Sequence, residues 1–96
     1  HMPVLKLKNP LTFGNSTVSQ LVFRDYAIAA DYMAFEKTGG TSQRIALIAS
    51  MTGMDEALIR KLHGRDYMAA VRMADALLDA EDKATTESEE ITDPKS

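Results

Sequence analysis

The spacing of apolar residues changes along the chain from the period of a strand to the period of a helix. Within residues 4–8, leucines alternate with lysines, which predicts a half-buried strand. Pro10 follows, and because proline has no N–H to donate, it restricts this strand to a sheet edge or a bulge. A second alternating run, residues 18–24, follows the turn-like residues 14–17, so the two strands are predicted to form a hairpin. Two strands alone are marginal in water, and the hairpin must therefore pack on helices.

The first two helical patterns lie on either side of a glycine pair. A helix is predicted over residues 26–37, with Asp25 as its N-cap and the glycines at 39–40 as its end. A second helix is predicted to begin near residues 41–42. It is apolar almost all round over residues 45–51, which indicates the central and most buried helix of the domain.

Two further helices are predicted after a tight glycine turn. Gly53 can supply the left-handed residue that ends the second helix, and Asp55 can cap the third. Met54 and Ile59 stand at the N′ and N4 positions of a hydrophobic staple at the start of that third helix. Asp66 is predicted to cap the last helix. The apolar positions of this helix recur at helical spacing, at Tyr67, Ala70, Val71, Ala74, Leu77 and Leu78.

The order of these elements predicts an α+β fold that is mainly α. An N-terminal β-hairpin packs on a bundle of about four short helices, within one domain at residues 3–80. Residues 1–2 are expected to be a tag remnant and the start residue. Residues 81–96 contain six acids, two lysines and one large apolar residue, Ile91. A segment with so little apolar surface cannot offset its ordering entropy, so we expect a disordered acidic C-terminal tail.

The composition restricts the chemistry that the chain can perform. The 96 residues contain no cysteine, which excludes a disulfide framework and a thiolate metal site. Because there is no cysteine, a catalytic Cys/His pair is excluded. Apart from the tag residue, His63 is the only histidine, so a zinc site lacks ligands. The glycine pair at 39–40 is not followed by the Lys-Ser/Thr pair of a phosphate loop. We expect a protein that is not an enzyme and that needs no metal or cofactor.

The apolar runs of the chain are short. None approaches the roughly 20 consecutive apolar residues that span a bilayer. The N-terminus also lacks the charged-then-apolar order of a signal peptide. These features predict a cytoplasmic protein without a membrane partner.

The segment 45–71 fits the geometry of a DNA-binding helix-turn-helix. Such a unit has a small residue, a turn glycine and an aliphatic packing residue at fixed spacing, and these positions are occupied by Ala49, Gly53 and Ile59. Asp55 and Glu56, however, stand at the head of the would-be recognition helix, where two carboxylates repel phosphate. The alternative function is therefore a small DNA-binding regulator, although the charges disfavour nucleic acid as the partner.

Methionines near the last two helices favour a protein-interaction module instead. Flexible thioethers make surfaces that adapt to an apolar partner, although methionine at helical spacing also commonly fills a core. We predict an apolar, methionine-containing groove beside the last two helices. The candidate partner-binding residues are Met54, Leu58, Leu62, Tyr67, Met68 and Met73.

Several segments taken in order resemble a known family. Its motifs here are LVFR at 21–24, EKTGG at 36–40, ALIASMTG at 46–53 and the Asp-Tyr pair at 66–67. In this order and spacing, residues 4–80 resemble the small tail assembly chaperones of Mu-like contractile-tailed bacteriophages and prophages. Members commonly have a proline soon after the strand-ending arginine, where this chain has Asp-Tyr.

The resemblance implies a non-enzymatic role in virion morphogenesis. Such a chaperone binds the long, helical tape measure protein in the host cytoplasm, keeps it soluble while the tail is built, and is absent from the mature virion. The tail tube protein is a further candidate partner, and self-association is left open. Related phages often make a longer chaperone by a frameshift near the end of this reading frame, where the acidic tail lies.

Overall fold

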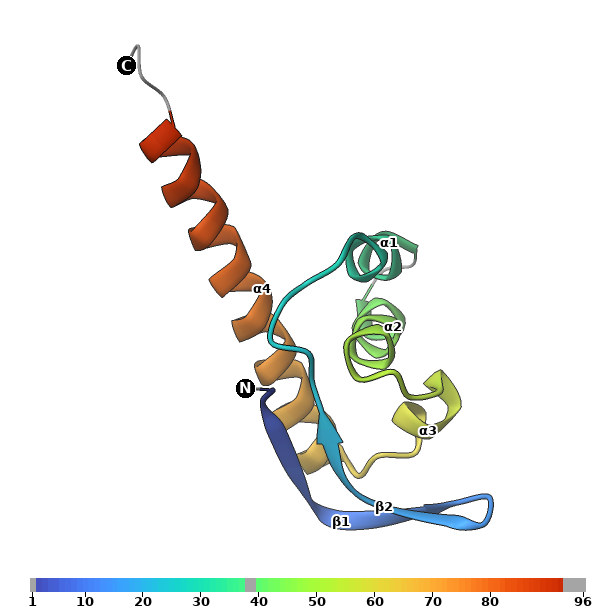
Figure 1. The fold of residues 1–96 in the computed structure, drawn as a ribbon. Coiled ribbons are helices and arrows are strands. Elements are labelled where there is room, and N and C mark those ends of the chain that lie inside the picture. The colour runs from blue at the N-terminus through green and yellow to red at the C-terminus, as the bar shows by residue number, and fades with distance from the viewer. Residues whose placement is uncertain (1, 38–39, 93–96) are drawn as a thin grey trace.

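A β-hairpin packed on four helices forms the part of the chain that the structure describes. The computed structural model covers residues 2–37 and 40–92, with side chains described for residues 2–34 and 40–86. Its elements are β1 (Val4–Phe13), β2 (Ser16–Val22), α1 (Ala29–Lys37), α2 (Gly40–Thr52), α3 (Glu56–Arg60) and α4 (Gly64–Thr92). In Figure 1, α4 lies on one side of the hairpin, and α1, α2 and α3 lie on the other. The predicted α+β architecture is confirmed.

The hairpin is longer than the sequence predicts. Phe13 lies opposite Ser16, so the turn consists of Gly14 and Asn15 alone. Gly14 has a φ of 65°, the left-handed conformation that two-residue hairpin turns require. Both strands therefore extend further toward the tip than the predicted four-residue turn allows.

β1 contains an irregularity where it passes Pro10. Between the Lys6–Gln20 and Leu11–Val18 pairs, β1 has four residues and β2 has one. Proline has no backbone N–H to donate to the hydrogen-bond ladder between the strands. At a bulge the residue lies outside the ladder, so this hydrogen bond is not needed. The predicted placement of Pro10 at an edge or bulge is confirmed.

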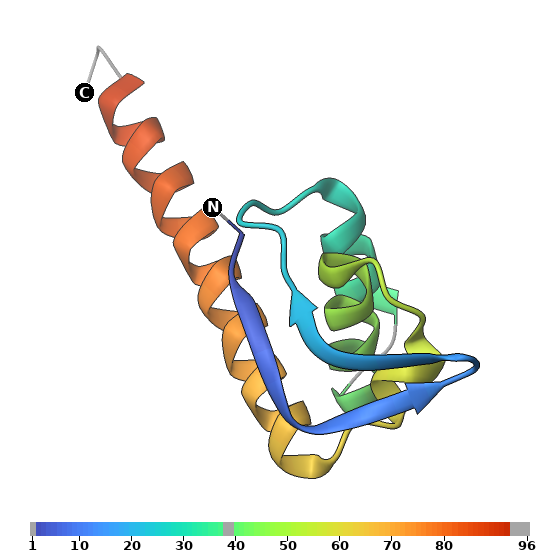
Figure 2. The same ribbon diagram turned by 60° about the horizontal axis from the view of Figure 1, so that its bottom comes forward.

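Asp66 pairs with the backbone of this irregular part of β1. Its Oδ1 accepts the N–H of Lys8 at 2.9 Å, and its Oδ2 accepts the N–H of Asn9 at 2.9 Å. The side chain is only 2% exposed. We predicted that Asp66 caps the last helix, and this was wrong, because α4 already begins at Gly64. The carboxylate instead joins the first turn of α4 to β1. Figure 2 shows the start of α4 beside the bend of β1.

The core lies between the apolar face of the hairpin and the helices. Leu21 and Phe23 of the hairpin segment are fully buried there. α2 supplies five buried residues, which confirms its prediction as the central helix: Ala46, Leu47, Ile48, Ala49 and Met51. Ala70 and Ala74, in the middle of the predicted apolar side of α4, are buried. Their small side chains let the helix approach the core closely.

α1 starts later than the sequence predicts. We placed its N-cap at Asp25, whereas the helix begins at Ala29. The N–H of Ile28 donates to Asp31 Oδ2 at 2.9 Å, and the N–H of Asp31 donates to the carbonyl of Ile28 at 2.9 Å. This reciprocal arrangement resembles a capping box, so Asp31 determines where the helix begins.

α4 continues into the segment for which we expected disorder. The helix runs to Thr92, and residues 93–96 lie outside the described residues. Side chains 82–86 are exposed, and this end of α4 projects away from the body in both views (Figures 1 and 2). Residues 81–92 contain four glutamates, which favour helix even without burial, and three threonines, which favour it less.

Replacing Asp66 with asparagine is expected to destabilise the fold. One carboxylate oxygen becomes an NH₂ donor facing a backbone N–H, so the Asp66→Asn variant loses about 2 kcal/mol of unfolding free energy. Urea denaturation followed by circular dichroism measures the loss. The matched control is Asp55→Asn at the exposed N-cap of α3, which makes no side-chain cap bond and should change stability by less than about 0.5 kcal/mol. Equal stability of the two variants would contradict the role given to Asp66.

Candidate functional site

The predicted partner-binding residues do not share one exposed surface. Leu58 and Leu62 are buried core residues, and of the two only Leu62 lines a surface depression. Met68 is 49% exposed, as expected of a residue off the main stripe of α4. The other three pack half-buried against the core: Met54, Tyr67 and Met73. α3 turns its apolar side inward, and this closes the end of the core where we expected a binding face.

A shallow groove does lie beside the last two helices. Its volume is about 200 Å³, and the exposed Arg60 stands beside it. Its apolar lining comes from α2, α3, the α3–α4 connection and the start of α4: Ile45, Ile59, Leu62 and Tyr67. We refer to these residues as the α2–α4 groove. Two of the six predicted residues, Leu62 and Tyr67, line it, whereas Met68 and Met73 do not.

The largest concentration of exposed apolar side chains surrounds the start of α1. Four large apolar residues within positions 26–33 are exposed, and Met33 reaches 72%. Ile28 and Tyr32 are four residues apart and so lie on one side of the chain as it enters the helix. We call this set the α1 surface, and it consists of Tyr26, Ile28, Tyr32 and Met33. The sequence does not reveal this surface, because the spacing of Ile28 and Tyr32 fits the buried side of a helix equally well.

A smaller exposed apolar group lies on the outer face of the hairpin. Val4 and Val22 face each other in the strand register, and Met2 precedes them. Beside them, a hollow of about 350 Å³ separates the hairpin from the end of α2. The signal for this group was present in the sequence, because valines alternate with the buried leucines and make both faces of the hairpin apolar at this end.

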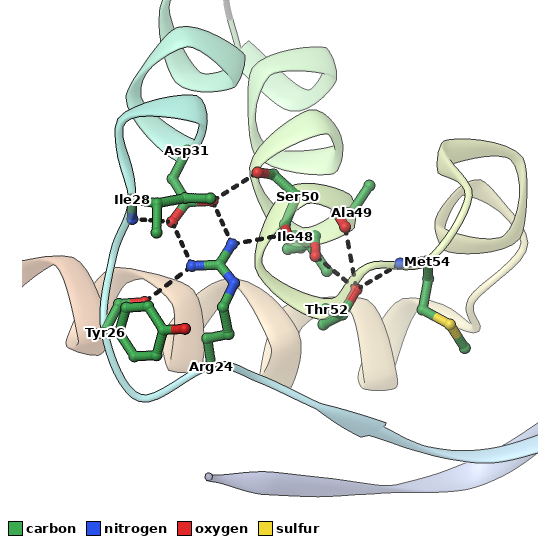
Figure 3. A network of polar contacts seen from close by, with 9 residues as sticks. All are labelled: Arg24, Tyr26, Ile28, Asp31, Ile48, Ala49, Ser50, Thr52 and Met54. Carbon is green, nitrogen blue, oxygen red and sulfur yellow. Dashed lines mark hydrogen bonds and ion pairs between the residues drawn. The ribbon is translucent and has the colours of Figure 1, made fainter.

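A polar network fixes the position of the α1 surface (Figure 3). The Arg24 guanidinium donates to both carboxylate oxygens of Asp31, at 3.0 Å and 2.8 Å. Ser50 donates its hydroxyl to Asp31 Oδ1 at 2.6 Å, and its carbonyl accepts from Arg24 Nη2 at 2.9 Å. Arg24 follows β2, Asp31 is in the first turn of α1, and Ser50 is near the end of α2. The network therefore joins three elements at one point.

Within this network, Arg24 and Asp31 each stabilise the charged form of the other. The Asp31 side chain is 0% exposed, and burial by itself raises its pKa. Hydrogen bonds from Arg24, from Ser50 and from the N–H of Ile28 outweigh burial, and the pKa of Asp31 lies below its ordinary value. The Asp31 hydrogen bond likewise raises the pKa of Arg24. Both groups are charged at neutral pH, and no buried side-chain polar atom of the described residues lacks a hydrogen-bond partner.

Arg24 also orients Tyr26 within the α1 surface. Its Nη1 donates to the Tyr26 carbonyl at 2.9 Å, and the guanidinium carbon lies 5.6 Å from the centre of the tyrosine ring. This distance is within the range of a cation–π contact. Arg24 thus contacts both the backbone and the exposed ring of Tyr26.

The helix-turn-helix spacing produces a packed helical corner. Ala49 and Ile59 are buried, and Gly53 has a φ of 73°, as a left-handed turn residue requires. α3 has only five residues, and Glu56 at its start lies 3.6 Å from Arg60. This short helix offers little positive charge to a phosphate backbone. Ala49, Gly53 and Ile59 thus have the geometry expected of a turn between two packed helices, and they serve to pack α3 on α2.

The described residues contain neither a metal site nor a membrane span. Across residues 2–37 and 40–92, no group of three or more His, Asp or Glu side chains is placed to hold a metal ion. No helix within these residues is both long and apolar enough to cross a membrane. The exposed apolar surfaces therefore remain the features that most need an explanation.

The stability that Asp31 contributes is expected to depend on pH. Its pKa in the folded protein is below the ordinary value of 3.8, so its contribution is fully present above the unfolded pKa and is lost as the pH falls through the folded pKa. We expect Asp31→Asn to lose about 3 kcal/mol at neutral pH. The difference between variant and wild type should be constant above about pH 5 and shrink below about pH 4. Urea denaturation at a series of pH values measures it.

A second ion pair supplies the control for this experiment. Arg44 and Asp75 form a salt bridge between α2 and α4, and both side chains are substantially exposed. Asp75→Asn is expected to cost less than about 1 kcal/mol. If Asp31→Asn were as mild as this control, the network would not be what holds α1 in place.

Comparison with known proteins adds no assignment to this geometry. No protein-family model, curated protein or solved structure matches the chain. The function proposed below is therefore supported by the residue patterns and surfaces described above.

Proposed function

We propose that the protein is a tail assembly chaperone of a contractile-tailed phage or prophage that binds the tape measure protein. The observation that carries this proposal is the α1 surface, where four large apolar side chains lie exposed within eight residues. The order of motifs along the chain supplies the identity of the partner, by resemblance. The role is non-enzymatic and belongs to the host cytoplasm before the virion is complete.

The chemistry of the α1 surface suits an apolar helical partner. Tyr26 and Tyr32 offer large aromatic contact areas, and these residue types are enriched at interfaces. Met33 is flexible and can adapt to different side chains along a rod-like partner. A tape measure protein presents a long apolar surface that would aggregate without cover, and reversible binding at such a surface prevents this.

The polar network lowers the cost of binding at this surface. Arg24, Asp31 and Ser50 hold the first turn of α1 before a partner arrives. A preorganised surface loses less conformational entropy when it binds. Each contact can nevertheless be weak, because many copies on one long partner act together through avidity.

Co-expression with the long helical protein encoded nearby tests the proposal. We expect the wild-type chain to keep that protein soluble and to co-purify with it. The double variant Tyr32→Asp, Met33→Asp places two charges on the α1 surface and should weaken capture at least about tenfold, since each large side chain contributes roughly 1.5–3 kcal/mol when buried. The amount of partner in the soluble fraction and in the pull-down is the measurement.

Met68→Asp is the matched control, because Met68 is an exposed methionine on α4, away from the α1 surface. We expect this variant to retain capture. Loss of capture with Met68→Asp alone would place the contact on α4, near the originally predicted site. If no variant, including wild type, solubilised the partner and the chain bound a DNA duplex in a salt-sensitive way, the helix-turn-helix function would replace the chaperone function.

A further inference from the structure

The two strands of the hairpin differ in how their outer edges are protected. An unprotected strand edge presents backbone N–H and C=O groups to which a further strand can be added. On β1, the N–H groups of Lys8 and Asn9 donate to the Asp66 carboxylate, and the register is irregular around Pro10. Lysines, a proline and a bulge on an edge strand each oppose the addition of another strand. The outer edge of β1 is therefore closed.

β2 has none of this protection. Its seven residues, Ser16–Val22, include no proline and no charged side chain, and five of the seven are exposed. Within the described part of the chain, the backbone of β2 is hydrogen-bonded to β1 alone. The outer edge is occupied only beyond the end of the strand, where the N–H of Arg24 donates to the Met51 carbonyl at 3.1 Å. The outer edge of β2 is therefore open along its length.

The lack of charge on β2 favours a second copy of the same strand as its partner. An antiparallel pair of identical strands is self-complementary, because a two-fold axis relates the two copies. Such a pair also brings identical side chains close together, and like charges opposite each other destabilise a sheet. β1 would suffer this conflict through Lys6 and Lys8, whereas β2 avoids it. Because each chain has a net charge of −3, an uncharged surface also lets two copies meet with little repulsion.

The hollow beside Val22 lies where the end of such a pair would be. Ser19 is the middle residue of β2, and an antiparallel pair centred on it uses all seven residues. Ser16 of one copy then lies opposite Val22 of the other. The Gly14–Asn15 turn of the first copy continues past Val22, toward the hollow of about 350 Å³ between the hairpin and the end of α2. The fold thus leaves space for this turn at the point where the open edge ends.

We propose that the outer edge of β2 pairs antiparallel with the β2 edge of a second copy of this chain, with Ser19 at the two-fold axis. The two hairpins then form one four-stranded sheet, whereas a two-stranded sheet alone is marginal in water. Because the same surface is used on both copies, the contact is isologous and ends at a dimer. It is separate from the α1 surface and does not rest on the chaperone function.

Sedimentation equilibrium of the full-length chain tests the proposal. We expect wild type to form a dimer as its concentration rises, and added salt should not weaken this dimer because β2 carries no charge. Ser19→Lys places two lysines opposite each other and should raise the dissociation constant at least about tenfold. The matched control is Thr12→Lys, at an exposed position on β1, which should associate as wild type does. A wild-type chain that stays monomeric up to about 1 mM would overturn the proposal.

A pair of opposite charges tests whether Ser19 lies at the axis. Ser19→Lys and Ser19→Glu should each associate weakly alone, because each opposes a charge to its own copy. An equimolar mixture should form a heterodimer in which lysine lies opposite glutamate, and salt should weaken this heterodimer. Failure of the mixture to associate, with both variants folded by circular dichroism, would overturn the proposed pairing.

The absence of cysteine allows a direct test of which residues meet. Residues directly opposite each other in an antiparallel pair have Cα atoms about 4.5–5.5 Å apart, a separation that a disulfide can bridge. Ser19→Cys should therefore form a disulfide-linked dimer under oxidising conditions. The control is Asn15→Cys at the hairpin tip, four residues from the axis, whose two copies would lie about 26 Å apart. Equal cross-linking of the two variants would overturn the proposal.

The two proposals can fail separately. Ser19→Lys should lose the dimer and still capture the helical partner in the co-expression assay, whereas the double variant Tyr32→Asp, Met33→Asp should do the reverse. Loss of partner capture by Ser19→Lys, with a wild-type chain that is monomeric on its own, would assign the β2 edge to the other protein and overturn the contact between copies.

Discussion

The position of α1 depends on one buried carboxylate. Asp31 receives hydrogen bonds from Arg24, Ser50 and the N–H of Ile28, and so joins the end of β2 to two helices. Without it, α1 would be held mainly by its packing on α2. Asp66 acts in a similar way at the other end of the molecule, where it joins α4 to β1. Each is a first-turn aspartate whose side chain bonds to backbone N–H groups before the helix or across the fold. A small domain with a modest core is thus stabilised at both ends by polar contacts that also define its geometry.

Local patterns predicted the elements, and long-range contacts determined where some of them begin. The hairpin, the buried α2 and the left-handed Gly53 follow from periodicity and turn chemistry, which act over a few residues. The role of Asp66 could not be predicted, because its partners are 57 and 58 residues away in the chain. An aspartate before a helical pattern resembles an N-cap in sequence, whether it caps the helix or, as here, reaches another element.

The candidate site was harder to predict than the fold for a related reason. Periodicity identifies the apolar side of a helix, but it does not tell whether another element covers that side. Leu58 and Leu62 are covered by the core, whereas Ile28 and Tyr32, which have equally good helical spacing, are exposed. Ile28 precedes α1, which begins at Ala29, and within the first turn of α1 Asp31 is buried whereas Tyr32 is exposed. A binding surface on a helical domain becomes visible only when the arrangement of the helices is known.

The length of α4 has a consequence for how the protein opens. Its inner half is stabilised by burial of Ala70 and Ala74, whereas side chains 82–86 make no buried contact and the helix there depends on local propensity. The two halves therefore belong to different cooperative units, and the outer turns can unwind and reform while the core stays intact. Amide hydrogens along one uninterrupted helix will exchange on very different timescales. The end of the helix is thus a segment whose order can change with its surroundings, attached to a body that does not change.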